Sequence, residues 1–259
     1  MTNLPCALIG IGEIGGILAK GLLRTGYPVY PVTRKMPTAT TLESMPNLKA
    51  VIVAVAEKDL HDVLAQIPKQ FHDRLVLIQN ELLPRDWEAH GIESPTVASI
   101  WFEKKPGKVE KVLMPTPVQG NLAELMIDAL ESVGIAARAV DTPERMLEEL
   151  VIKNVYILTT NIAGLKVGGN VATLWSEHRD LAEAVADEVI ALQHWLTGQR
   201  FDRQRLIDGM VRGFEGDPEH MCMGRSAPAR LERALSLAAE AGINTPVMRS
   251  IKNNTTTIT

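Results

Sequence analysis

The chain has little cysteine, little excess charge and no long hydrophobic segment. Its two cysteines among 259 residues, Cys6 and Cys222, are too few for a disulfide framework and lack metal-ligand spacing, which favours a reducing compartment. A net charge of -4 gives no basic field for nucleic acid or an anionic membrane. The longest apolar run, residues 50–56, is about a third of the ~20 residues that a membrane span needs.

Several common motifs are missing as well. The N-terminus shows no basic segment followed by an apolar stretch and a small-residue cleavage site. The histidines form no His-Glu-x-x-His motif or Cys/His cluster, and there is no Gly-x-Ser-x-Gly sequence. We therefore expect a cytoplasmic protein with no metal centre, no nucleic-acid partner and no membrane partner.

The pattern of apolar residues predicts an α/β domain followed by an all-α domain. Short apolar strands alternate with helical segments in the first half, which is typical of a doubly wound parallel sheet of the Rossmann type. We predict strands at residues 5–9, 29–32, 50–55, 75–78 and 136–140, shorter extended pieces between 94 and 118, and a helix at 122–133. Only helical patterns follow Thr142, at 144–165, 176–197, 202–213 and 227–241, before a polar, frayed tail at 253–259. The predicted domains are 1–141, binding a cofactor, and 142–259, binding substrate or a second copy of the chain.

A glycine motif indicates dinucleotide binding in the first domain. The segment Gly10-Ile11-Gly12-Glu13-Ile14-Gly15 follows an apolar strand and opens an amphipathic helix. The first glycine permits the tight turn, the second lets a pyrophosphate approach the backbone, and the third lets helix pack on strand. Free N–H groups at the helix start would receive the phosphate charge. The alternative is an ordinary glycine-rich turn.

The end of the second predicted strand favours NADP(H) over NAD(H). NAD-binding domains carry an acidic residue there, whereas this chain has Thr33, Arg34 and Lys35. Arg34 could donate two hydrogen bonds to a 2'-phosphate, and Lys35 adds a positive charge. A charged hydrogen bond of roughly 1.5–3 kcal/mol would change cofactor preference by one to two orders of magnitude. The alternative is a solvated basic turn.

The helical pattern near 144–165 contains candidate catalytic residues. Apolar residues surround this segment on nearly every side, as in a buried helix, yet it contains Lys153, Thr160 and Asn161. At 100° per residue these three could line one polar strip. Because a buried ammonium group is costly unless paired, Lys153 either faces a ligand or pairs with Glu149 one turn away.

Taken together, these motifs resemble the ketopantoate reductase family, within the 6-phosphogluconate-dehydrogenase-like superfamily. The resemblance covers nearly the whole chain and implies an active site between a Rossmann domain and a helical domain. The glycine motif and Arg34 match the positions where the family binds NADP. Asn80 matches an asparagine that touches cofactor and substrate, Lys153 matches the catalytic lysine, and Asn161 matches a downstream asparagine.

The substrate-recognising half departs from the family pattern. Glu81 stands where the family has a glycine, and Ile157 where it has an asparagine. Phe214 and Ser226 fall at positions of a family serine and glutamate. The resemblance therefore implies a reductase whose substrate differs from that of the family.

The implied reaction is hydride transfer from NADPH to the carbonyl of a small keto acid. Lys153 would polarise the carbonyl and supply the proton, with its pKa lowered by a partly buried cleft. Asn80, Thr160 and Asn161 would orient the substrate. Arg225, in the second domain, could bind a substrate carboxylate.

Two other functions stay open. The departures from the family pattern are compatible with a regulatory protein that binds NADP(H) without turnover. The segment 114–117 (Met-Pro-Thr-Pro) resembles pyrroline-5-carboxylate reductases and keeps imine reduction open, although we interpret it as an extended edge strand. The sequence does not decide whether the chain forms a homodimer.

Overall fold

The computed structural model describes residues 3–45 and 47–256, which form two compact units that divide between Glu149 and Leu150. The first unit is built on a seven-stranded sheet with the order β2-β1-β3-β4-β5-β8-β9. Its strands are β1 (Cys6–Ile9), β2 (Val29–Val32), β3 (Ala50–Val53), β4 (Leu75–Leu77), β5 (Thr96–Ala98), β8 (Thr116–Gln119) and β9 (Ala137–Ala139). The predicted α/β class with a helical C-terminal part is confirmed.

The sheet is parallel except at one pair of strands. β8 runs antiparallel to β5, because the chain turns back through a two-stranded hairpin of β6 (Phe102–Glu103) and β7 (Lys111–Val112). The prediction that residues 114–117 form an edge strand is wrong, since β8 lies between β5 and β9. Pro117 is tolerated inside the sheet, where its carbonyl accepts a hydrogen bond from the Ser99 N–H at 3.0 Å.

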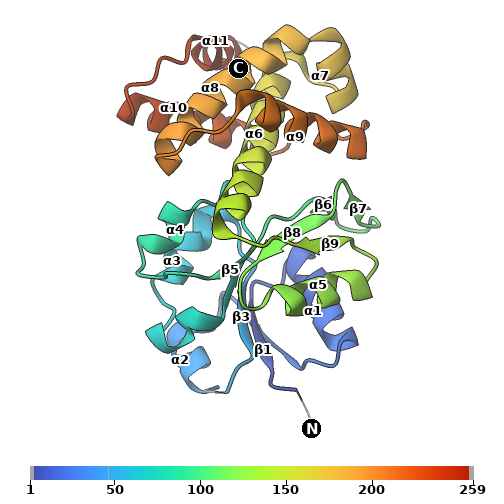
Figure 1. Ribbon diagram of the computed structural model, residues 1–259, viewed down its shortest axis with the longest axis vertical. Coiled ribbons are helices and arrows are strands. Elements are labelled where there is room, and N and C mark those ends of the chain that lie inside the picture. Colours follow the sequence, from blue (N-terminus) through green and yellow to red (C-terminus); the bar gives the residue numbers. More distant parts are fainter. Residues whose placement is uncertain (1–2, 46, 257–259) are drawn as a thin grey trace. The chain divides into compact units, whose positions relative to one another are not determined.

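Helices cover both faces of this sheet (Figure 1). α1 (Glu13–Arg24) and α5 (Ala123–Ser132) lie side by side on one face, and α2 (Thr38–Glu43), α3 (Leu60–Leu64) and α4 (Pro84–Glu88) lie on the other. Two short 3-10 helices, η1 (Glu57–Asp59) and η2 (Lys69–Arg74), join these elements. A Cβ on Gly21 would lie 2.2 Å from the Ala129 carbonyl oxygen, so glycine lets α1 and α5 touch over the core.

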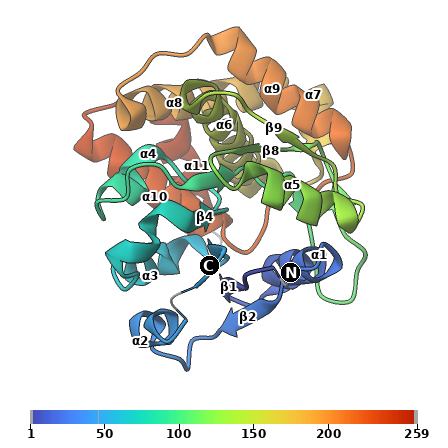
Figure 2. The same ribbon diagram turned by 60° about the horizontal axis from the view of Figure 1, so that its bottom comes forward.

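The second unit contains helices α7 to α11 and most of α6 (Pro143–Val167), the helix on which the sequence placed Lys153. Every residue from 150 to 164 is buried, which confirms the predicted buried helix. Figures 1 and 2 show α6 running among the helices that follow it. These are α7 (Val171–Glu177), α8 (Arg179–Thr197), α9 (Arg203–Gly216), α10 (Ala227–Glu240) and α11 (Pro246–Thr256).

Three boundaries differ from those predicted. The expected helix at 176–197 is two helices that meet at His178, and the side chain of Asn170 caps the first by accepting from the Thr173 N–H at 2.9 Å. The domain boundary expected at 141 lies just before α6, whereas the two units divide within α6, at 149/150. Residues 253–256 of the predicted frayed tail belong to α11, and 257–259 lie outside the described residues.

The last helix is held by contacts that the sequence pattern did not show. Met248 and Ile251 are buried. The buried carboxylate of Glu188 in α8 accepts from the N–H groups of Val247 and Met248 at 2.7 and 2.9 Å, which satisfies the first turn of α11.

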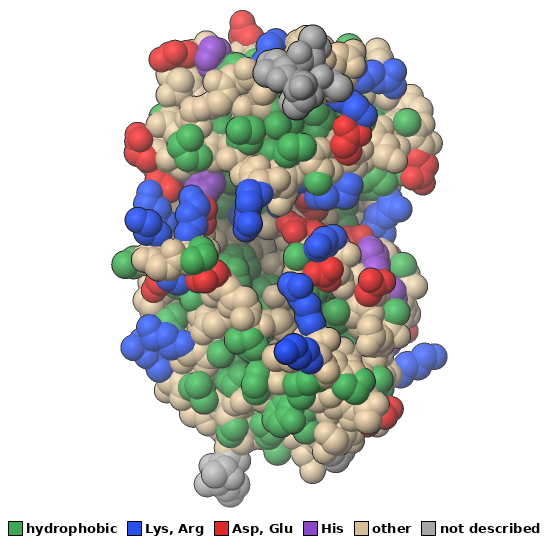
Figure 3. Space-filling view, turned by 180° about the vertical axis from the view of Figure 1, so that it is seen from behind, with side chains coloured by type: hydrophobic (Ala, Val, Ile, Leu, Met, Phe, Trp, Pro, Cys, Tyr) green, Lys and Arg blue, Asp and Glu red, His purple; other side chains and the backbone are tan. Residues whose placement is uncertain are grey.

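The surface carries both signs of charge. On the face drawn in Figure 3, basic and acidic side chains are interspersed, in keeping with the small net charge. Among the described residues no helix is long and apolar enough to cross a membrane. The same part of the chain holds no group of three or more His, Cys, Asp or Glu residues suited to a metal ion.

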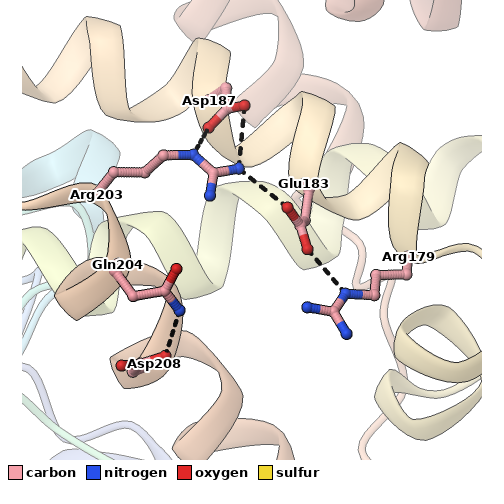
Figure 4. Close-up of polar contacts among 6 residues, drawn as sticks. All are labelled: Arg179, Glu183, Asp187, Arg203, Gln204 and Asp208. Carbon is pink, nitrogen blue, oxygen red and sulfur yellow. Dashed lines mark hydrogen bonds and ion pairs between the residues drawn. The ribbon is translucent and has the colours of Figure 1, made fainter.

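An ion-pair network connects α8 with the start of α9 (Figure 4). Arg203 donates two hydrogen bonds to Asp187, at 2.5 and 3.2 Å, and one to Glu183 at 3.1 Å. Arg179 donates to the other oxygen of Glu183 at 2.8 Å. These hydrogen bonds hold the pKa of Glu183 below its usual range. Because Arg203 is 44% exposed, solvent screens much of this energy.

We predict that Arg203→Ala lowers the free energy of unfolding by about 1 kcal/mol, since it removes a bidentate pair and a bridge between two helices. Urea unfolding of both proteins at low salt measures this loss. The loss should shrink in 1 M salt, where charges are screened within about 3 Å. An equal loss at both salt concentrations would show that Arg203 acts through packing.

Candidate functional site

The first candidate region lies at the carboxyl edge of the sheet. β1 pairs in register with β2 and with β3, so the segments after these strands begin next to one another. The Gly10 N–H donates to the Val32 carbonyl at 3.1 Å, and the Ala54 N–H donates to the Ile9 carbonyl at 2.7 Å. Ligands of open parallel sheets bind at this edge.

The three glycines of the turn differ in their surroundings. A Cβ on Gly10, whose φ is +96°, would lie 2.6 Å from the Ala54 carbonyl oxygen. A Cβ on Gly15 would lie 2.1 Å from the Gly10 carbonyl oxygen. A Cβ on Gly12 would meet nothing within 4 Å. Gly10 and Gly15 are therefore required by the packing of the turn, whereas Gly12 leaves the backbone open to a ligand.

The start of α1 offers backbone donors beside Gly12. Gly12 is the N-cap residue and provides no side-chain cap, so the first N–H groups of the helix are available to an anion. Ile11 and Glu13 are exposed and Ile14 is half-buried. These features fit the pyrophosphate of a dinucleotide, which would lie against Gly12 and the first turn of α1.

The basic residues Arg34 and Lys35 follow β2 in a turn closed by a 2.9 Å hydrogen bond from the Met36 N–H to the Thr33 carbonyl. Thr33, Arg34 and Lys35 are all exposed. Because β2 adjoins β1, this turn starts at the same sheet edge as the glycine turn. Its positive charges suit the ribose phosphate of a dinucleotide better than an acidic residue would.

The segment after β4 is fixed to β3 by a buried side chain. Gln79 donates to the carbonyls of Val53 and Val55 at 2.7 and 3.4 Å, and it accepts from the Ile78 N–H at 3.1 Å. The half-buried Asn80 comes next. Glu81 then has φ of 60°, the only positive φ among the described non-glycine residues. The resemblance implies a glycine at this position, and a glycine would adopt this left-handed backbone without strain, whereas this chain has a glutamate.

The second candidate region surrounds Lys153 in α6. Lys153 is 9% exposed, and its Nζ atom lies 5.6 Å from the centre of the Tyr156 ring. Burial, together with the positive charge of Arg230, lowers the pKa of Lys153 to about 7. Glu149, the structural partner that the sequence offered, accepts from Arg138 at 2.6 Å. A lysine with such a pKa can donate and accept a proton near neutral pH.

The structure brings Asn161 together with an arginine that the sequence analysis missed. Arg230 in α10 donates from Nη1 to Asn161 Oδ1 at 3.2 Å, and both side chains are buried. Thr160 is also buried, and its hydroxyl donates to the carbonyls of Tyr156 and Ile157 in its own helix, at 2.8 and 3.2 Å. Arg225, by contrast, is exposed in the turn before α10.

A sequence signal for Arg230 did exist. The buried positions of α10 follow the helical period, and Arg230 stands within that stripe, which otherwise holds Ala227, Leu231, Ala234 and Ala238. An arginine in an apolar stripe is unusual and marks a functional or structural site.

Two of the family departures, Ile157 and Phe214, are part of the helical core. Phe214 is buried, and its ring lies 5.7 Å from that of Tyr156 and 5.8 Å from that of Trp175. Ile157 is buried, whereas Ser226 is the exposed N-cap of α10. At Ile157 and Phe214, apolar packing therefore occupies positions for which the resemblance implied polar groups.

Comparisons with known proteins place this chain by its fold. No protein-family profile and no curated protein matches it. A dimeric ketopantoate reductase from Staphylococcus aureus matches with a TM-score of 0.64 and 18% identity over 98% of each chain. A ketopantoate reductase from Ralstonia eutropha matches with a TM-score of 0.66 and 12% identity, over 98% of this chain and 97% of its own. D-mandelate dehydrogenase in complex with NADH matches with a TM-score of 0.65 and 14% identity, over 96% of this chain and 97% of its own. The chain therefore has the fold of ketopantoate reductases, as the resemblance implied.

We predict that Glu81→Gly raises the free energy of unfolding by about 1 kcal/mol. The left-handed backbone strains a glutamate by more than glycine gains in freedom in the unfolded chain. Urea unfolding checks the change. The matched control is Glu93→Gly, in an exposed loop with negative φ, which should lower stability slightly. Equal losses in both variants would contradict the strain argument.

Proposed function

We propose that this protein is an NADPH-dependent reductase that converts a small 2-oxo acid or related carbonyl compound to the alcohol. The observation that carries the proposal is the buried Lys153, whose pKa near 7 suits proton transfer to a carbonyl oxygen. The shared fold with ketopantoate reductases and with an NADH-bound D-mandelate dehydrogenase supports an oxidoreductase.

The cofactor would be held by the first unit. Gly12 and the start of α1 would receive the pyrophosphate, and Thr33, Arg34 and Lys35 would receive the ribose phosphate. When bound, the nicotinamide supplies the hydride. Asn80, which follows the Gln79 anchor, would contact cofactor and substrate at this edge of the sheet.

The substrate would be held by the second unit. Lys153, as the ammonium, would donate a hydrogen bond to the carbonyl oxygen and then its proton, so that this oxygen becomes the hydroxyl group of the product alcohol. Thr160, Asn161 and Arg225 are the further substrate contacts that the sequence predicted. Of these, Asn161 is the one that the structure joins to a second buried polar group, Arg230.

Calorimetric titration of NADPH and NADH tests the cofactor half of the proposal. We expect the wild-type protein to bind NADPH more tightly, and Arg34→Gln to lose about 10- to 100-fold in NADPH affinity while NADH affinity changes little. A preference for NADH would overturn the role of Arg34. Absence of binding to folded protein would show that the glycine turn is only structural.

Two alanine variants, one at the N-cap of α1 and one inside this helix, form a matched pair for this titration, with Gly16→Ala as the control. Gly12→Ala should weaken both cofactors, because its methyl group fills the space that the pyrophosphate needs, yet it meets no protein atom. Gly16→Ala also meets nothing within 4 Å but lies beyond the first turn, so it should leave binding unchanged.

The pH dependence of the rate tests the role of Lys153. Because the donor is the ammonium form, kcat/KM for carbonyl reduction should fall as pH rises above about 7. Arg230 lowers the pKa of Lys153, so Arg230→Gln should move this fall to higher pH. Lys153→Met should remove the pH-dependent rate while leaving NADPH affinity unchanged. A protein that binds NADPH but reduces nothing, with or without Lys153, would instead fit a regulatory role.

A further inference from the structure

A buried hydroxyl stands at the carboxyl edge of the sheet. Ser99 directly follows β5 and is 2% exposed. Among the described residues its Oγ atom finds no hydrogen-bond partner. A buried hydroxyl without a partner destabilises a fold, because it has lost its hydration and gained no hydrogen bond in exchange. Since most buried polar groups in proteins are paired, this exception needs a physical explanation.

The backbone fixes the position of Ser99. Its N–H donates to the Pro117 carbonyl at 3.0 Å, which continues the pairing of β5 with β8. Its neighbours Ala98 and Ile100 both belong to the hydrophobic core that includes the buried faces of α1 and α5. Because side chains alternate along an extended chain, the Ser99 hydroxyl points away from that core.

Ser99 lies next to the segment that carries Asn80. β4 and β5 are parallel, and Leu77 pairs with Val97. Two residues further on, Gln79 and Ser99 occupy matching positions at the ends of these strands. Gln79 is fixed to the end of β3, and the half-buried Asn80 follows it. Because neighbouring strands are about 4.8 Å apart, a ligand that contacts Asn80 would lie about one strand spacing from Ser99.

The order of the strands indicates which part of a dinucleotide would meet Ser99. In the proposed site, the pyrophosphate lies at the glycine turn after β1 and the ribose phosphate lies after β2. β2 is at one edge of the sheet, whereas β3, β4 and β5 follow on the other side of β1. The two halves of a dinucleotide extend in opposite directions from the pyrophosphate. The nicotinamide half would therefore extend over β3 towards the ends of β4 and β5.

We propose that the Ser99 hydroxyl is a hydrogen-bond partner of the nicotinamide carboxamide. This assignment rests on the proposed function. A carboxamide has both donors and an acceptor, and a hydroxyl can pair with either. Because the hydroxyl is already dehydrated in the free protein, the new hydrogen bond offsets a cost that the fold bears without the cofactor.

Calorimetry with two ligands tests this assignment. NADPH contains the nicotinamide half, whereas adenosine 2',5'-bisphosphate contains only the end of the cofactor that Arg34 is proposed to bind. We expect Ser99→Ala to weaken NADPH binding about 3- to 10-fold, and to change the affinity for the bisphosphate by less than about twofold. Arg34→Gln should weaken both ligands. Unchanged NADPH affinity in Ser99→Ala, or an equal loss for the two ligands, would overturn the assignment.

Thermal unfolding of the ligand-free proteins provides a second measurement. Removal of a hydroxyl without a partner should raise the Tm of Ser99→Ala by about 2–4 °C. The matched control is Thr245→Val in the second unit, because Thr245 has another buried hydroxyl that lacks a partner among the described residues. This variant should also raise the Tm, but it should leave NADPH affinity unchanged. A lower Tm in Ser99→Ala would show that its hydroxyl already has a partner in the protein, and would contradict the assignment.

The two ligands also separate this assignment from the proposed function. Wild-type protein that binds the bisphosphate as tightly as NADPH gains nothing from the nicotinamide half. That result would overturn the role of Ser99 and leave the proposed role of Arg34 intact. Wild-type protein that binds neither ligand would overturn the cofactor proposal, and this assignment with it.

Discussion

The burial of Lys153, on a helix that other helices cover on every side, is the constraint on which the arrangement of the helical unit depends. An ammonium group loses several kcal/mol of hydration when it enters a protein interior, which lowers the pKa of a buried lysine and marks it as a candidate functional residue. Here α6 is buried from residue 150 to 164. The helices packed around it exclude water from Lys153, and this burial lowers the pKa of the lysine. Gly209 of α9 shows how close this packing is, since a Cβ there would lie 2.6 Å from the Ile152 side chain.

The first unit follows a different rule, because its backbone rather than its side chains makes most of the candidate cofactor site. Parallel strands end together at one edge, and the segments that leave them are forced into proximity by the register of the sheet. Gln79 strengthens this arrangement by tying the end of β4 to the end of β3. The strain at Glu81 immediately after it is the kind of local cost that persists where a backbone shape is required for function.

The sequence predicted what depends on local pattern. Alternating strand and helix signals predicted the sheet, the glycine spacing predicted the turn, and the apolar residues around Lys153 predicted the buried helix. It did not predict α11, because the contacts that hold this helix are long-range and leave no local periodicity. They are the buried side chains of Met248 and Ile251 and the carboxylate of Glu188, which lies 58 residues before Pro246 and caps the first turn. It also assumed that proline confines residues 114–117 to an edge, whereas Pro117 needed only its carbonyl to take part in an interior strand.

Arg230 escaped prediction for the same physical reason. In sequence it is one of several arginines in the last third of the chain, and Arg225 was the one that we predicted to bind substrate. Its place in the apolar stripe of α10 was a signal in the sequence, but its partner Asn161, 69 residues earlier in α6, appears only in the structure. Asn161, which the sequence predicted as a substrate contact, accepts a hydrogen bond from this buried guanidinium. Ile157 and Phe214 are apolar at positions that are polar in the family that the chain resembles, so a buried polar contact of α6 comes instead from an arginine of another helix.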